Sequence, residues 1–321
     1  MKKCIIITLI ICTLCVCLIG CTESAEGYVF GTFYSTELSS NAASSLTDEV
    51  VSVWDDLDNI FSTSITGSIV YNINNANSNE LVAIDTDFLY IWDLAVSMSE
   101  LSAVFNPWYF PLVELWGFSP DTYTGVATSI PTDAEITETL SYCSADCFVI
   151  DRATMTITKT DSRAQIDFGA FLKGYAVDVG VDIVQDSCDE YLINVGGTIA
   201  TNRNLTVMVT NPRGSGYVAS FTLDNEAVAT SGDYERYYIY DDVRYSHIIS
   251  TNGYPSICGD NMPISVTVVG ASATYCDTLS TVIMILGEGA TELVESLGYS
   301  ALVITEDSYY VMGDKNFDVN W

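Results

Sequence analysis

Residues 273–287, Ala-Thr-Tyr-Cys-Asp-Thr-Leu-Ser-Thr-Val-Ile-Met-Ile-Leu-Gly, combine an apolar pattern with two oxygen-bearing side chains, Asp277 and Thr281. The apolar residues predict a helix packed on the core, and positions four apart lie on one helical face. A carboxylate and a hydroxyl there are hard ligands that suit Mg²⁺ holding phosphate oxygens. The chain has a single histidine, His247, which disfavours zinc and iron sites. For this segment alone, a polar pair on the outer face of a core helix remains the alternative.

The N-terminus has the pattern of an export signal. Lys2 and Lys3 precede an apolar run that ends in Leu18-Ile19-Gly20-Cys21. A membrane span needs about 20 apolar residues, so this shorter run favours a signal peptide. Leu-Ile-Gly-Cys resembles the lipobox of prokaryotic lipoproteins, with a chance match as the alternative. We expect a signal peptide over residues 1–20, a lipidated Cys21 with a short polar tether over 21–26, and a mature protein anchored by lipid on the extracytoplasmic face of the cell membrane.

The charge balance narrows the range of partners. The chain carries 42 acidic and 11 basic residues, for a formal net charge of −31. Such a surface repels nucleic acids and anionic lipid head groups. No stretch after the leader is long and apolar enough to cross a bilayer. Acidity of this kind also fits a salty habitat, and it does not identify a reaction.

Half of the ten cysteines lie at or before Cys21. The others have no Cys-x-x-Cys spacing, and we assign no disulfide. Cys143 and Cys147 have helical spacing, which favours core thiols over a metal or redox pair.

Helix and strand patterns alternate irregularly along residues 27–321, which we interpret as one domain. Apolar residues at helical spacing predict helices over residues 46–61, 86–103, 169–185, 273–287 and 291–297, and Thr132 is a candidate cap for another helix. Residues 105–119 are expected to form an ordered loop, and residues 230–234 a turn. Strands are expected over residues 28–35, 148–150, 155–158, 191–195, 205–210, 217–223, 227–230, 236–240 and 264–269, with two more at the C-terminal end. This pattern predicts an α+β fold of largely antiparallel sheets packed with helices.

Several polar residues fall where these elements begin or end. Asp167 stands at a helix start with Lys173 two turns later, and Gly196-Gly197 closes a strand, where glycine allows a ligand to approach the backbone. His247 lies at a strand end. Each has a structural alternative: Asp167 as a helix cap, Lys173 as a solvated charge, the glycines as an ordinary turn, and His247 as a satisfied structural residue.

The order of these pieces resembles the ApbE-type FAD:protein FMN transferases, a family with a T-fold-like catalytic domain and with exported, lipid-anchored members. The resemblance covers nearly all of the expected mature chain. Its pieces, in chain order, are Phe30-Gly31-Thr32, Phe61-Ser62-Thr63 with Ser68 and Asn74, Phe105 through Pro111-Leu112-Val113 to Leu115-Trp116-Gly117-Phe118, Asp167 to Asp178, Asn194 to Gly197, Thr230 to Arg236, His247-Ile248-Ile249 with Gly253-Tyr254-Pro255, and Asp277 to Thr281.

The resemblance implies roles for individual residues. Asp277, Thr281 and the main-chain carbonyl of Ala170 are expected to hold Mg²⁺ or Mn²⁺, and His247 corresponds to the histidine that flavin transfer requires. FAD, the substrate, is expected to contact Phe30, Ser64, Phe105, Asn106, Asp167, Lys173 and Ile249.

The chain also departs from the family pattern. Phe30 stands where methionine is usual, and Ser64 where a tyrosine normally stacks on the cofactor. Asn106 and Ser250 replace aspartates, and the loop after His-Ile-Ile is one residue short. Ser280 occupies a place where some members carry a second acidic metal ligand. These changes weaken stacking and remove negative charge near the pyrophosphate, which bears on the choice between transfer and hydrolysis.

The resemblance therefore implies transfer of the FMN moiety of FAD to a threonine or serine hydroxyl of an extracytoplasmic redox protein, with release of AMP. One alternative is a metal-dependent FAD pyrophosphatase, in which water replaces the hydroxyl. Another is a non-catalytic flavin-binding lipoprotein, which the lost tyrosine and aspartates favour. A surface adhesin fits the acidity and the anchor but leaves the ordered motifs unexplained.

Overall fold

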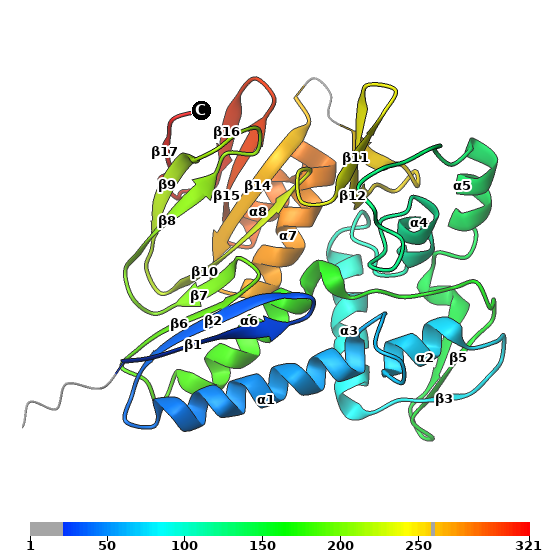
Figure 1. Ribbon diagram of the computed structural model, residues 1–321, viewed down its shortest axis with the longest axis horizontal. Helices are drawn as coiled ribbons and strands as arrows, with labels where there is room; N and C mark the ends of the chain where they lie inside the picture. The colour runs from blue at the N-terminus through cyan, green and yellow to red at the C-terminus, as the bar shows by residue number, and fades with distance from the viewer. Residues whose placement is uncertain (1–21, 258–260) are drawn as a thin grey trace, which may run out of the picture.

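A computed structural model describes residues 22–257 and 261–321, so Cys21, Cys258 and the expected signal peptide lie outside the described residues. An antiparallel sheet of eight strands, in the order β1-β2-β6-β7-β10-β14-β15-β16, forms the centre of the fold (Figure 1). Its strands are β1 (Thr22–Val29), β2 (Thr32–Ser39), β6 (Glu190–Val195), β7 (Thr198–Thr201), β10 (Glu226–Gly232), β14 (Pro263–Gly270), β15 (Ser300–Thr305) and β16 (Tyr309–Met312).

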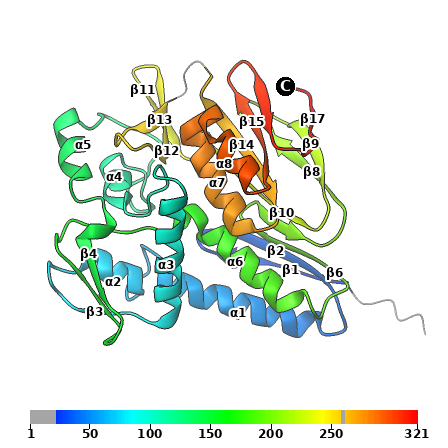
Figure 2. The same cartoon turned by 180° about the vertical axis from the view of Figure 1, so that it is seen from behind.

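Four helices cover one face of this sheet, as the view from behind shows (Figure 2). They are α1 (Ala43–Phe61), α6 (Gly169–Val184), α7 (Ala273–Leu286) and α8 (Thr291–Ser296), with the 3₁₀ turn η2 (Gly287–Ala290) between the last two. A three-stranded sheet packs on the other face, in the order β17 (Asp318–Val319), β9 (Tyr217–Leu223) and β8 (Leu205–Thr210). Strand β15 shows why both faces are covered: Ala301 and Val303 belong to the main core, while Leu302 and Ile304 belong to a second apolar cluster.

The remaining elements form a second region beside the sheet (Figure 1). It contains α2 (Ile69–Asn75), α3 (Thr86–Leu101), α4 (Phe110–Leu115), α5 (Asp133–Leu140), η1 (Ala145–Cys147), the sheet β3-β5-β4 (Val82–Ala83, Thr156–Lys159, Phe148–Asp151) and the sheet β11-β12-β13 (Tyr237–Tyr240, Val243–Ile249, Pro255–Ile257). Stacked rings join the segment just after α4 to β11 and β12, as in the pairs Phe118–Tyr238 and Trp116–Tyr245. Residues of this region and of the central sheet line a common cavity.

The α+β prediction and its antiparallel sheets are confirmed. The Thr132 cap is also confirmed: its hydroxyl accepts from the Glu135 N–H, and the Glu135 carboxylate accepts from the Thr132 N–H. In the described part of the chain, Cys143 and Cys188 are buried free thiols, and Cys147 is a half-buried one. None of the described helices is long and apolar enough to cross a membrane.

Other predictions were wrong, mostly at the first hairpin. Residues 22–26 are not a tether, because β1 begins at Thr22 and pairs with β2 along its whole length. Residues 28–35 are not one strand: Phe30 and Gly31 have φ values of 50° and 70°, which reverses the chain in a two-residue turn. Residues 230–232 belong to β10 rather than to a turn.

Two short helices lie outside the helices that the sequence predicted. The first is α2, whose start is capped by the Ser68 hydroxyl. The second is α4, which has a proline in its first turn, where the missing N–H is not needed.

Candidate functional site

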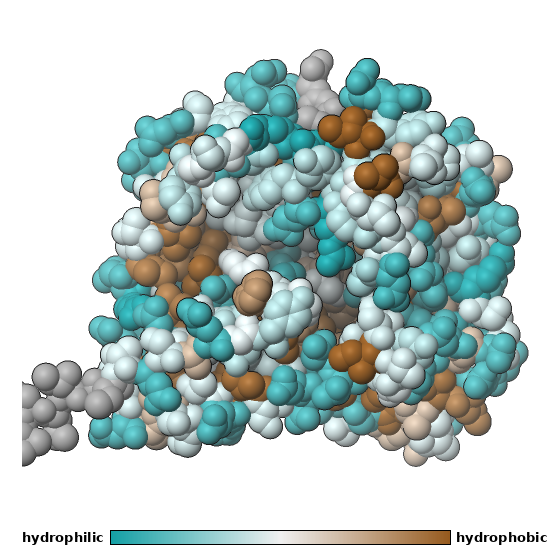
Figure 3. Space-filling view, in the orientation of Figure 1, coloured by the Kyte–Doolittle hydropathy of each residue, from teal (hydrophilic) through white to brown (hydrophobic). Residues whose placement is uncertain are grey.

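A cavity of about 380 Å³ lies where the tip of the β1–β2 hairpin, α6, α7, β10 and β12 meet. The space-filling view shows the molecule hollowed near the centre of this face (Figure 3). Every residue predicted to hold the metal, contact FAD or act in flavin transfer lines the cavity, with the exception of Ser64. These residues are Phe30, Phe105, Asn106, Asp167, Ala170, Lys173, His247, Ile249, Asp277 and Thr281.

Ser64 is exposed in the loop between α1 and α2 and does not line the cavity. The loop folds back on the end of α1, because the Ser62 hydroxyl accepts from the N–H groups of Ser64 and Ile65. A short side chain here does not reach the cavity, so the sequence-based assignment of Ser64 has no geometric support.

Gly174 brings α6 and α7 into backbone contact at the site. A Cβ atom at this position would lie 2.4 Å from the Ala273 carbonyl oxygen. The close approach lets the Gly174 N–H donate to Asp277 Oδ2 over 3.0 Å. In a regular helix this N–H bonds to the Ala170 carbonyl, so Asp277 competes for the donor that Ala170 normally uses.

Asp178, one turn further along α6, fixes the start of α7. Its carboxylate accepts from the Ser272 hydroxyl over 2.6 Å, from the Ala273 N–H over 2.8 Å, and from both the N–H and the hydroxyl of Thr274. These bonds satisfy N–H groups that a helix start leaves without partners, and a negative charge is favourable there. The sequence alone does not indicate this role, because Asp178 and Ser272 are far apart in the chain.

Three oxygen donors line the cavity where α6 contacts α7, at the α6–α7 junction. The Asp277 carboxylate is 5% exposed, Thr281 follows it one turn later on the same face, and Ala170 stands in the first turn of α6. Burial raises the pKa of Asp277, while the Lys173 ammonium and the Gly174 N–H act in the opposite direction. The Lys173 Nζ lies 3.5 Å from Asp277 Oδ2. Within residues 22–257 and 261–321, no three His, Cys, Asp or Glu side chains form a metal cluster.

One carboxylate with a hydroxyl and a carbonyl fits Mg²⁺, which is commonly held by one or two carboxylates together with substrate phosphates. The same set does not fit zinc, which is bound through nitrogen and sulfur. The donor chemistry of the junction is therefore that of a hard divalent cation.

Asp167 precedes α6 and faces the cavity. Its Oδ1 accepts from the Gly169 N–H over 2.9 Å, and its own N–H donates to the Pro107 carbonyl. Burial raises the pKa of this carboxyl, while the Gly169 N–H and the charges of Arg236 and Lys173 oppose the rise. Asp167 thus stands one residue before the N-cap residue Phe168, accepts from the first N–H of α6 and lines the cavity.

His247 is held by the main chain of Arg236. The Arg236 carbonyl accepts from the His247 N–H over 3.0 Å and lies 3.2 Å from its Nδ1. Because a carbonyl only accepts, the proton of the neutral ring is on Nδ1 and Nε2 is left as an acceptor. Burial, with the charges of Arg236 and Lys173, lowers the pKa of His247 to about 4. The imidazole is therefore neutral at pH 7.

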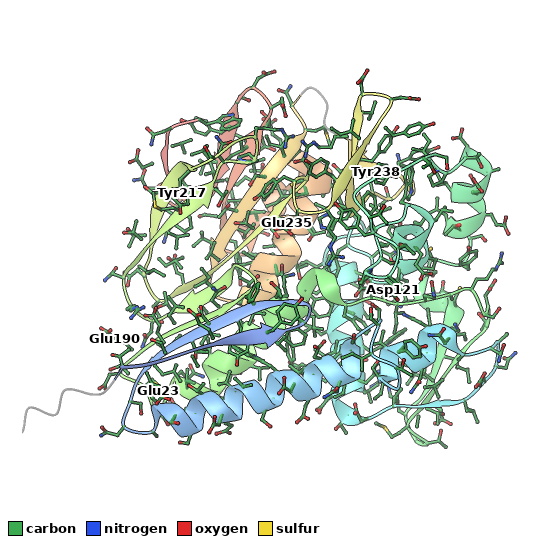
Figure 4. All side chains as sticks on the ribbon, in the orientation of Figure 1. Glu23, Asp121, Glu190, Tyr217, Glu235 and Tyr238 are labelled. Atoms are coloured by element: carbon green, nitrogen blue, oxygen red, sulfur yellow. The ribbon has the colours of Figure 1, made fainter. Side chains whose placement is uncertain are left out.

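Glu235 and Arg236 are two charged residues of the cavity that the sequence did not single out. Both line the cavity, and Glu235 lies near the middle of this face (Figure 4). Burial raises the pKa of Glu235. The segment is anchored by Asp233, whose carboxylate accepts two hydrogen bonds of 2.7 Å from Arg213. The sequence signal that could have indicated Glu235 and Arg236 is a pair of adjacent opposite charges just after a buried strand.

The chain is similar to known proteins along most of its length. The FAD:protein FMN transferase of Vibrio cholerae is 28% identical over 323 residues, 94% of each chain. That of Klebsiella pneumoniae is 30% identical over 78% of this chain and 77% of its own. The crystal structure of the ApbE protein from Thermotoga maritima superposes with a TM-score of 0.79 at 26% identity, covering 91% of this chain and 97% of the other.

The flavin transferase ApbE from Vibrio cholerae superposes with a TM-score of 0.75 at 25% identity, with the same coverage. The family model described as the ApbE family matches residues 30–303, a range that begins at the hairpin tip and contains every residue of the cavity. The chain belongs to the ApbE family.

Proposed function

We propose that this protein transfers the FMN moiety of FAD to a threonine or serine hydroxyl of an acceptor protein and releases AMP. One observation carries the proposal: the oxygen donors Asp277, Thr281 and Ala170 share a single cavity with the neutral imidazole of His247. Relatives that match along most of the chain are named FAD:protein FMN transferases, which supports the same reaction.

The donor set at the α6–α7 junction suits Mg²⁺ or Mn²⁺, with Asp277, Thr281 and the Ala170 carbonyl as the protein ligands. Such a cation neutralises phosphate charge and polarises the P–O bond that breaks. The Lys173 ammonium, 3.5 Å from Asp277, is placed to balance the charge of the carboxylate and of a bound phosphate.

We assign binding of the flavin nucleotide to the cavity residues outside the metal site. Phe30, Phe105 and Ile249 supply apolar surface for the ring system, and Asn106 and Asp167 supply polar contacts. Of the residues first assigned to FAD, Ser64 is not part of this proposal.

His247 acts on the acceptor hydroxyl. Its Nε2 takes the hydroxyl proton as the oxygen attacks the phosphorus of the FMN half, a new O–P bond forms, and the bond between that phosphorus and the AMP oxygen breaks. The Arg236 carbonyl holds the ring in the required tautomer. A base in this position typically contributes about 10²–10⁴-fold to the rate.

The test is incubation of the purified protein with FAD, Mg²⁺ and an acceptor that bears a threonine, followed by mass spectrometry of the acceptor. The proposal predicts the mass of a phosphoester-linked FMN on the acceptor and one AMP for each transfer. Release of free FMN with an unmodified acceptor would instead establish an FAD pyrophosphatase.

Substitutions at the site distinguish a non-catalytic flavin-binding protein from a flavin transferase and from an FAD pyrophosphatase. Asp277→Ala and His247→Ala each abolish FAD turnover if the site is correct. Turnover that is the same in both variants and in the unsubstituted protein would place the chemistry elsewhere, and the absence of turnover in all three would favour a binding protein.

We further propose that the mature protein is anchored through a lipid on Cys21 at the extracytoplasmic face of the cell membrane, where redox-protein acceptors share the same membrane plane. The leader sequence supports this proposal. Because β1 begins at Thr22, the lipid would join the edge strand of the sheet without a linker. Mass spectrometry of the mature N-terminal peptide tests the anchor, and a Cys21→Ala variant should lose membrane association.

A further inference from the structure

Arg236 lines the cavity and has no ion-pair partner among residues 22–257 and 261–321. None of the described carboxylates lies within 4.0 Å of its nitrogens. The chain carries 42 acidic residues against 11 basic ones, so an arginine could readily be matched. The other arginines of the described chain each have a partner: Asp93 for Arg152, Glu138 and Asp161 for Arg163, Glu37 for Arg203, Asp233 for Arg213, and the Tyr237 ring for Arg244.

The main chain of Arg236 is nevertheless fixed on both sides. Its carbonyl accepts from the N–H and faces the Nδ1 of His247. Three residues earlier, Asp233 is tied to Arg213, and the Asp233 N–H donates to the Ile264 carbonyl over 3.1 Å. The fold therefore fixes the main chain of Arg236 at the cavity. Its exposed guanidinium carries five N–H donors that can reach a ligand there.

The neighbours of Arg236 show which part of the cavity it serves. Its charge acts on the carboxyl groups of Asp167 and Glu235 and on the ring of His247. These groups, Lys173 and the oxygen donors of α7 line the same cavity, and the Lys173 Nζ lies 3.5 Å from Asp277 Oδ2. Apolar side chains such as Val104, Phe110 and Val113 also line it.

We propose that Arg236 binds the diphosphate of the dinucleotide substrate and, with Lys173, holds it beside His247. This inference rests on the proposed function and deepens it, because it assigns the anionic group of the substrate to a specific side chain. A planar guanidinium donates two parallel hydrogen bonds to phosphate oxygens, which an ammonium does not. Arg236 therefore orients the phosphorus relative to Nε2 of His247, in addition to neutralising its charge.

The experiment measures affinity by calorimetry with three probes: FAD, ADP and riboflavin, with Mg²⁺ present throughout. Because hydrogen bonds to a charged group are lost, we expect Arg236→Gln to lower the affinity for both FAD and ADP by about 10- to 100-fold. Riboflavin, which has no phosphate, should bind the variant and the unsubstituted protein equally. Arg236→Lys should recover part of the loss, because it restores the charge but not the paired geometry.

The matched control is Arg203→Gln, which removes the same charge from a surface pair with Glu37 that does not line the cavity. It should leave all three affinities unchanged. Equal affinity for FAD in Arg236→Gln and in the unsubstituted protein would overturn the inference while leaving the proposed function intact. Loss of riboflavin affinity equal to the loss for ADP would also overturn it, since Arg236 would then act by shaping the cavity.

Failure of the unsubstituted protein to bind either FAD or ADP is a different result. It would overturn the proposed function together with this inference, and it is seen before any variant is made. An unchanged affinity for ADP combined with a raised KM for the acceptor protein would reassign Arg236 to the acceptor and overturn the inference alone.

Discussion

Substitution of Gly174 by alanine tests how the helix junction builds the site. The added Cβ would lie 2.4 Å from the Ala273 carbonyl oxygen and 2.7 Å from both the Ala273 carbonyl carbon and the Thr274 Cα. Ordinary contacts are about 3.5 Å or longer, so α6 and α7 must separate by roughly 1 Å. All of these atoms are main chain, so no side-chain rotation relieves the clash.

The structural consequence falls on Asp277. A separation of this size lengthens the 3.0 Å hydrogen bond from the Gly174 N–H beyond a useful distance. Overpacking of this kind costs about 1–3 kcal/mol. Alanine is the better helix former by about 1 kcal/mol, which offsets only part of the cost. We expect a lower midpoint of thermal unfolding.

The functional consequence is weaker metal binding. Loss of a hydrogen bond to a charged group corresponds to about 10- to 100-fold in affinity. Titration of Mn²⁺, followed by electron paramagnetic resonance of the free ion, measures this directly and independently of turnover.

Gly180→Ala in the same helix is the matched control. Its Cβ meets side-chain atoms rather than main chain, namely Cδ1 of Ile193 at 3.0 Å and Cζ2 of Trp54 at 3.3 Å, and it lies six residues beyond Gly174 in α6. Gly180→Ala should bind Mn²⁺ as the unsubstituted protein does. A Gly174→Ala protein with unchanged Mn²⁺ affinity and unchanged unfolding midpoint would refute the reasoning.

Three further predictions concern stability and pH. Asp178→Asn places an amide donor against the donors at the start of α7, so it should lower the free energy of unfolding by about 1–3 kcal/mol in urea titrations, whereas exposed Asp182→Asn should have little effect. Because the pKa of His247 is lowered to about 4, kcat/KM for transfer should stay level from pH 7 to about 5 and fall only as the pH approaches 4; a fall centred near 6.5 would contradict the assignment. Burial lowers the pKa of Lys159 to about 8, so the unfolded chain binds more protons than the folded chain above that pH. The free energy of unfolding of the unsubstituted protein should therefore rise between about pH 8 and 10 relative to that of Lys159→Met. A difference between the two proteins that does not change with pH would contradict this prediction.

Local patterns predicted the helices other than α2 and α4, and the residues on them. The apolar spacing of residues 273–287 predicted α7, and the four-residue interval placed Asp277 and Thr281 on one face, which lines the cavity. The Thr132-Glu135 interval predicted the start of α5 because a capping box is a local interaction.

Most of the features that the sequence did not predict depend on contacts between distant segments. Asp178 and Ser272 are far apart in the chain, and so are Gly174 and Asp277, so no periodicity shows that they meet. The Phe30-Gly31 turn was missed because a phenylalanine in the left-handed region is unusual. Ser64 was placed by the order of the family motifs, but the direction of a loop is set by its own hydrogen bonds.

Anomalous diffraction from crystals soaked with Mn²⁺ and FAD tests the central claim most directly. We predict one manganese peak coordinated by Asp277, Thr281 and the Ala170 carbonyl, with the FAD diphosphate against it and the FMN phosphorus facing His247. A peak at another site, or a flavin bound with its diphosphate away from the α6–α7 junction, would contradict the account.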